Sequence, residues 1–99
     1  MKYGVLKTRR FKRSISKLDK SIAKRILRDL EGVPLEDDPA SGKPLKDFVK
    51  VEINGRIRKY RLWELKVGPK KAYRLFYIIE KRRREVYLLE VMHRSVSFR

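Results

Sequence analysis

The amino-acid sequence predicts an α+β fold in the order β-α-α-β-β-β, with a helical hairpin packed on one face of a small, mostly antiparallel, twisted sheet. Three observations lead to this prediction. Apolar residues recur at helical spacing in the first third of the chain, whereas the last third contains apolar runs of strand length separated by short turns. The chain has 99 residues, of which 41% are hydrophobic, and this suits one modest core. We therefore expect a single domain spanning residues 1–99.

The N-terminal part predicts a short strand and then two helices. Residues 2–7 alternate around apolar side chains, as a strand does. Thr8 can cap the first helix, and either Asp19 or Ser21 can cap the second. Gly32 supplies a stop signal for the second helix. The apolar stripes are Phe11, Ile15 and Leu18 in the first helix, and Ile22, Ile26, Leu27 and Leu30 in the second. Because the joint between them is short, the two helices should form an αα-hairpin.

The C-terminal part predicts three strands joined by turns, at residues 60–67, 72–80 and 85–93. The last two are apolar on both faces, which suits central strands with something packed on each side. A turn-rich loop covers residues 34–44. An Asn-Gly turn at 54–55 lies between alternating apolar residues, and this segment fits either a small hairpin or an irregular excursion.

The charge is the strongest feature of the composition. Lys and Arg total 28 against 12 acidic residues, which gives a net charge of +16. An excess of this size costs stability through self-repulsion, so a polyanion is the expected partner. A thermophile surface would balance its cations with Glu in ion-pair networks, and that balance is missing. We therefore favour a nucleic-acid partner.

Several classes of protein and of site are disfavoured. The chain contains no Cys and one His, so we expect no disulfide, no metal site and no cofactor. No apolar run approaches the roughly 20 residues of a membrane span, and the N-terminus lacks the apolar region of a secretory signal. We expect a cytoplasmic protein without a membrane partner.

Three stretches of the sequence resemble the RelE/ParE superfamily of toxins. They are "LWELKVG…AYRLFYIIE" (62–80), the terminal "VYLLEVMHRSVSF" (86–98) and "SGKPLKD" (41–47), which is similar to the family's Gly-Lys-x-Leu segment. The order of elements resembles the superfamily over the whole chain, and the motifs do so mainly over its last third.

The resemblance implies a toxin of a toxin–antitoxin pair, with a cognate antitoxin as partner. The RelE branch cleaves mRNA on the ribosome without a metal, whereas the ParE branch shares the fold but inhibits DNA gyrase. We favour the RelE branch, hence an endoribonuclease that inhibits translation. A ParE-type gyrase inhibitor is the alternative, and a basic RNA-binding domain without toxicity is a third reading.

Metal-independent cleavage uses the 2′-hydroxyl of the RNA as nucleophile. It needs a base, cations around the phosphorane oxygens and an acid for the leaving 5′-oxygen. By position, the resemblance implies that Arg74 and Arg94 clamp the phosphate and that Lys66 and His93 share proton transfer. Glu64 stands where relatives have a lysine, and it could serve as a substitute base.

Four of the catalytic candidates also have a structural interpretation. Arg74 could instead bridge to Glu64 or Glu90, and Glu64 could pair with Lys66 on an exposed face. His93, at the end of a strand, could serve packing alone.

Other residues fit RNA binding. Phe98 stands near a tyrosine of the RNA-cutting relatives, where it could stack on a base or pack in the core. The remaining candidates supply general phosphate-binding charge. They are Lys46, Arg61, Lys70 and Lys71.

Overall fold

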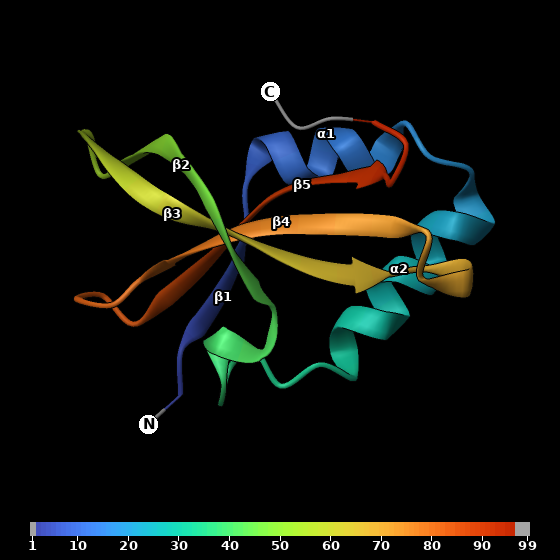
Figure 1. Cartoon of the computed structure of the whole chain (residues 1–99), viewed down its shortest axis with the longest axis horizontal. Coiled ribbons are helices and arrows are strands. Elements are labelled where there is room, and N and C mark those ends of the chain that lie inside the picture. Colours follow the sequence, from blue (N-terminus) through green and yellow to red (C-terminus); the bar gives the residue numbers. More distant parts are fainter. Residues whose placement is uncertain (1, 97–99) are drawn as a thin grey trace.

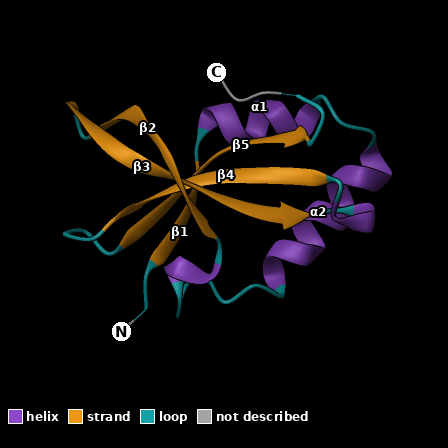
Figure 2. Ribbon diagram, viewed as in Figure 1, coloured by secondary structure: helices purple, strands orange, loops and turns teal. Residues whose placement is uncertain are grey.

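The computed structural model describes residues 2–96 and places two helices on one face of a five-stranded sheet (Figures 1 and 2). The strand order is β1-β5-β4-β3-β2, with β1 parallel to β5 and all other neighbours antiparallel. The predicted α+β class and its helical hairpin are confirmed. The elements are β1 (Gly4–Lys7), α1 (Arg9–Ser16), α2 (Lys20–Glu31), β2 (Lys43–Ile53), β3 (Arg56–Val67), β4 (Tyr73–Glu80) and β5 (Glu85–His93), with 3-10 turns at Pro39–Ser41 and Pro69–Lys71.

Local capping starts and ends the helices as the sequence predicts. The Thr8 side chain accepts a hydrogen bond from the Phe11 N–H (3.1 Å) and caps α1. Asp19, rather than Ser21, caps α2 by accepting from the Ser21 N–H (2.9 Å), and α2 ends at Gly32. Such caps satisfy backbone groups that have no partner within a helix.

The segment around the Asn-Gly turn is a long hairpin, so the order is β-α-α-β-β-β-β. Strand β2 pairs with β3 from Ile53↔Arg56 to Lys43↔Glu64, with an irregularity between Pro44 and Phe48. Asn54 and Gly55 both have positive φ (52° and 79°), as a two-residue hairpin turn of this hand requires. The sequence allowed either a hairpin or an irregular excursion here. In the structure, β2 is a strand at the edge of the sheet.

Both faces of the sheet carry apolar clusters. On one face, the helices bury Phe11 and Ile26 against Leu75, Tyr77 and neighbouring side chains. The second cluster lies on the opposite face, where the twisted β2–β3 hairpin adds partly buried side chains. It comprises Ile53, Leu62, Phe76, Ile78, Leu89 and Met92, with Leu45, Val49, Val51, Tyr60 and Tyr87 packed against them. This explains why β4 and β5 are apolar on both sides.

Glu80, at the end of β4, is a buried carboxylate with fixed partners. It accepts hydrogen bonds from the Tyr60 hydroxyl and from the Arg82 N–H (2.9 Å), and only 8% of the residue is exposed. The bond from Tyr60 lowers the pKa of Glu80, and the Arg82 N–H and the nearby Arg58 and Arg82 charges add to this against the opposing effect of burial.

This carboxylate predicts a loss of stability in acid. A carboxyl whose pKa is lowered by folding stabilises the protein above its unfolded pKa of about 4.3 and loses that contribution as pH falls through the folded value. We expect the urea midpoint to fall below pH 4.5, and the fall to be smaller in Glu80→Gln. Equal pH profiles for the two proteins would contradict this role of Glu80. Glu52→Gln, an exposed carboxylate on β2, serves as control.

Candidate functional site

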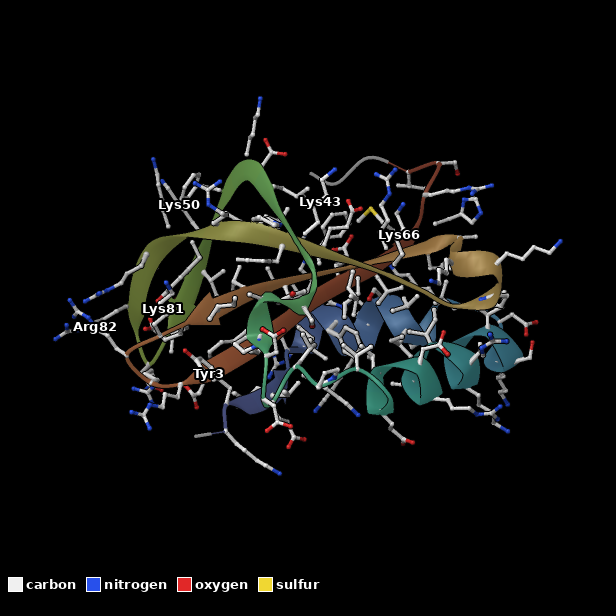
Figure 3. The ribbon with its side chains drawn as sticks, turned by 60° about the horizontal axis from the view of Figure 1, so that its bottom comes forward. Tyr3, Lys43, Lys50, Lys66, Lys81 and Arg82 are labelled. Carbon is white, nitrogen blue, oxygen red and sulfur yellow. The ribbon has the colours of Figure 1, made fainter. Side chains whose placement is uncertain are left out.

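Lys66 and Arg74 are direct partners across β3 and β4. Their strand neighbours Leu65, Val67 and Leu75 pack toward the helices, so both cations project from the opposite face. Figure 3 shows Lys66 on the side of the sheet away from α1 and α2. Lys66 is exposed and the Arg74 side chain is 39% exposed. Paired residues in a sheet have Cβ atoms roughly 5 Å apart, so the two cations can reach one phosphate group.

Glu64 lies on the same face, next to this pair. Its carboxylate is 3.9 Å from the Arg74 Nε, and its side chain is only 12% exposed. Its neighbour across β3 and β4 is the buried Phe76. At 3.9 Å the contact is an ion pair rather than a hydrogen bond. Of the structural interpretations, the bridge from Arg74 to Glu64 is thus observed.

Lys43 joins these residues, although sequence reasoning did not select it as a site residue. It is the register partner of Glu64 across β2 and β3 and is exposed. Figure 3 shows it on the same side of the sheet as Lys66. We call Lys43, Glu64, Lys66 and Arg74 the basic face. The resemblance of the "SGKPLKD" segment to the toxin superfamily pointed to this part of the chain. The sequence did not show, however, that the segment pairs with β3 and so places Lys43 beside Glu64.

A close contact holds the start of β2 in place. The Gly42 N–H donates to the Tyr77 hydroxyl (3.0 Å), which itself donates to the Pro39 carbonyl (2.8 Å). Tyr77 is fully buried, and burial raises the pKa of its hydroxyl to about 12. A Cβ on Gly42 would lie 2.4 Å from that hydroxyl and 2.7 Å from the Glu64 carbonyl oxygen. Glycine is therefore required here for β2 to bring Lys43 beside Glu64.

His93 lies on the other face of the sheet. It is paired with Tyr73, whose ring it meets edge-on at 5.3 Å between centroids. Together with Tyr73 it lines a cavity against α1 that also includes Arg13 and Lys17. The structure therefore does not bring His93 together with the basic face.

The hydrogen bonds of His93 also define its tautomer. The Ser95 N–H donates to His93 Nδ1 (3.2 Å), and the Ser95 hydroxyl lies 2.9 Å from the same nitrogen. A backbone N–H can only donate, so Nδ1 is an acceptor and the neutral ring carries its proton on Nε2.

This geometry predicts a small effect of removing the imidazole. If the chain cleaves RNA, as the resemblance implies, we expect His93→Ala to change the cleavage rate by less than about tenfold, because proton abstraction typically contributes 10²–10⁴-fold and His93 is not placed for it. Single-turnover cleavage measures this. A loss of a hundredfold or more would restore His93 as a base.

The C-terminal ends of β3 and β5 and the start of β4 lie side by side at one end of the sheet (Figure 1). The exposed Arg94 follows β5 there, and its N–H donates to the Ala72 carbonyl (2.9 Å). Lys70 and Lys71 form the turn between β3 and β4, both with positive φ (55° and 53°). These three cations therefore lie at the same end of the sheet as Lys66 and Arg74.

Two further RNA-binding candidates lie on the β2–β3 hairpin. Arg61 donates to the Leu45 carbonyl (2.6 Å) and covers the Phe48 ring at 4.7 Å, so its guanidinium is held against β2. Lys46 is exposed at the irregular part of β2. Phe98 lies outside the described residues.

Within residues 2–96, no three His, Cys, Asp or Glu side chains form a group that could hold a metal ion. In the same part of the chain, no helix is long and apolar enough to cross a membrane.

Solved toxin–antitoxin structures share this fold. A chain of the RelBE2 toxin–antitoxin complex from Mycobacterium tuberculosis is 26% identical, with a TM-score of 0.64 over 95% of this chain and 100% of that chain. A chain of the archaeal RelE–RelB complex from Pyrococcus horikoshii is 20% identical (TM-score 0.56, 98% and 100% covered). A mutant of the Escherichia coli toxin RelE in the free state is 17% identical (TM-score 0.54, 94% and 84% covered). The latter two likenesses concern the fold alone.

The sequence itself identifies the family. Residues 5–98 match the model of the ParE toxin of type II toxin–antitoxin systems, parDE, so the chain belongs to this toxin family. The predicted membership of the RelE/ParE superfamily is confirmed. A comparison with curated proteins gives no match.

Proposed function

We propose that this toxin is an endoribonuclease of the RelE type, which cleaves mRNA on the ribosome, inhibits translation and is silenced in the cytoplasm by a cognate antitoxin. The observation that carries the proposal is the basic face, where Lys66 and Arg74 are direct partners beside the Glu64 carboxylate. The antitoxin is supported by the family, and by two similar structures that are toxin–antitoxin complexes.

The basic face has the groups that cleavage by a 2′-hydroxyl needs. Glu64 accepts the 2′-hydroxyl proton, the 2′-oxygen bonds to phosphorus, and the bond from phosphorus to the 5′-oxygen breaks. Arg74 and Lys66 stabilise the negative charge on the phosphorane oxygens. The Lys66 ammonium donates a proton to the leaving 5′-oxygen. The products are a 2′,3′-cyclic phosphate and a 5′-hydroxyl.

The remaining candidates act around this centre. Arg94 binds the RNA phosphate from the end of the sheet, with Lys70 and Lys71 beside it. His93 lies on the other face and is assigned no proton-transfer step at this centre. Lys46, Arg61 and Phe98 are proposed to contact RNA outside the reacting phosphate.

Incubation with translating ribosomes tests the proposal. We expect new mRNA 5′ ends to appear after toxin addition, and their mapping locates the cut relative to the ribosome. Full-length mRNA on stalled or unaffected ribosomes would contradict a nuclease.

Glu64→Gln tests the identity of the base. The amide keeps the size and most contacts of Glu64 but cannot accept the proton, so we expect cleavage to slow by about 10²-fold or more. Single-turnover rates and thermal melting are measured together, with Glu52→Gln on β2 as the matched control. An unchanged cleavage rate would mean that Glu64 is not the base that accepts the 2′-hydroxyl proton.

Gyrase inhibition is the second candidate function. It is favoured by the match to the ParE toxin family and by the position of His93 away from the basic face. Supercoiling by purified gyrase separates the two functions, because a nuclease of the RelE type should leave supercoiling unchanged.

A further inference from the structure

A second cationic site lies at the far end of the sheet from Arg94. The turn between β2 and β3 and the turn between β4 and β5 flank a cavity of about 300 Å³ that is open to solvent. Four arginines line it together with the Tyr60 and Glu80 side chains: Arg56, Arg58, Arg82 and Arg83. Figure 3 shows Arg82 at the opposite end of the sheet from Lys66.

Glu80 is the one carboxylate among the described residues that line this cavity, and it forms no hydrogen bond with their arginine side chains. One oxygen of Glu80 accepts from the Tyr60 hydroxyl, and the other accepts from the Arg82 backbone N–H. Glu80 therefore links β3, β4 and the following turn, and it is one of the residues that line the cavity. Both carboxylate oxygens thus accept hydrogen bonds from groups other than a guanidinium, whereas Arg58 and Arg82 act on Glu80 through their charge alone.

Three of the arginines are available for a ligand. Arg83 donates to Glu85 (2.8 Å). By contrast, the side chains of Arg56, Arg58 and Arg82 make no hydrogen bond or ion pair within residues 2–96, and all three are exposed. Guanidinium groups bind phosphate oxygens in a bidentate manner, so several around one cavity define an anion site.

We infer that this cavity binds a backbone phosphate of the RNA strand that reaches the basic face. Arg74 and Glu80 are six residues apart on β4, which corresponds to about 20 Å at the rise of a strand. One phosphodiester cannot occupy both places, so the cavity is a separate anchor. That the strand is RNA rests on the proposed function, whereas the phosphate chemistry rests on the arginines alone.

The anchor is tested by RNA binding without cleavage. Arg58→Gln/Arg82→Gln is introduced into the full chain carrying Arg74→Ala, so that the RNA stays intact. The control in the same background is Lys24→Gln/Arg28→Gln, which removes the same charge from the exposed face of α2. The affinity for a labelled single-stranded RNA is measured over a series of salt concentrations by fluorescence anisotropy. Arg58, Arg82, Lys24 and Arg28 are all exposed, the half-buried Arg74 is replaced in both proteins alike, and thermal melting verifies that the variants are folded.

The cavity variant should lose about tenfold in affinity and its salt slope should decrease by about 1, whereas the control should lose less than about twofold. Equal losses in both variants, or no loss in the cavity variant, would overturn the anchor. Inorganic phosphate is titrated separately by following the arginine Nε–H resonances. If it binds while the cavity variant keeps its RNA affinity, the assignment to RNA is overturned. Because no ribosome and no cleavage enter this measurement, a chain that fails to cut mRNA can still show the anchor.

Discussion

Arg74→Ala is expected to reduce mRNA cleavage by roughly 10²- to 10³-fold, the cost of removing one preorganised donor to a developing negative charge. Arg74 is the partner of Lys66 across β3 and β4, on the face of the sheet away from the helices, and its Nε lies 3.9 Å from the Glu64 carboxylate. Its removal leaves Glu64 without its ion pair and, under the proposed mechanism, deletes a cation from the scissile phosphate. Single-turnover cleavage on ribosomes measures the loss, and growth arrest on induction should weaken in parallel.

The matched control is Arg28→Ala, on the exposed side of α2. It removes the same charge from the face that lies away from the site, so cleavage should change by no more than a few-fold. If Arg74→Ala retains cleavage within threefold of the wild type, the basic face is not the catalytic centre, and gyrase inhibition becomes the preferred function.

Gly42→Ala is expected to destabilise the protein by about 2–3 kcal/mol, as overpacking of a well-packed site does. The new Cβ would meet the Tyr77 hydroxyl at 2.4 Å and the Glu64 carbonyl oxygen at 2.7 Å. The carbonyl belongs to β3 and cannot rotate away, and Tyr77 is fixed in the core by its bond to Pro39. Urea unfolding measures the change in free energy.

Gly4→Ala provides the control, because nothing lies within 4 Å of a Cβ built there. Its stability should stay within about 0.5 kcal/mol of the wild type. Equal stability of the two alanine variants would show that the start of β2 adapts to a side chain, and that Lys43 is not held by this contact.

The sequence predicted the helices well because their signals are local. Thr8, Asp19 and Gly32 act within one turn of each helix end. Strand β2 was harder to predict, since most of its side chains are exposed and its pairing is irregular between Pro44 and Phe48. Its period-two alternation is therefore weak, and only its partner β3 fixes its place.

The face on which His93 lies depends on an irregularity in the pairing of β4 with β5, which the alternation of residues in the sequence does not reveal. Strict alternation from Leu88 would place His93 on the face of Arg74. In the structure the pairing shifts between Phe76 and Tyr77, so that Leu88 and Val91 both pack toward the helices. This bulge reverses the alternation and turns His93 to the helical side. The bulge lies between β4 and β5 and does not affect the pairing of Lys66 with Arg74 across β3 and β4. The short turn between these two strands fixes the register of that pairing.

The chemistry of the cut ends tests the central claim most directly. Reporter mRNA translated with the toxin should yield fragments with a 5′-hydroxyl and a 2′,3′-cyclic phosphate, and a 2′-deoxy nucleotide at the cut position should abolish cleavage at that site. Fragments with 5′-phosphates, or uncut mRNA together with inhibited gyrase, would contradict cleavage by the 2′-hydroxyl at the basic face.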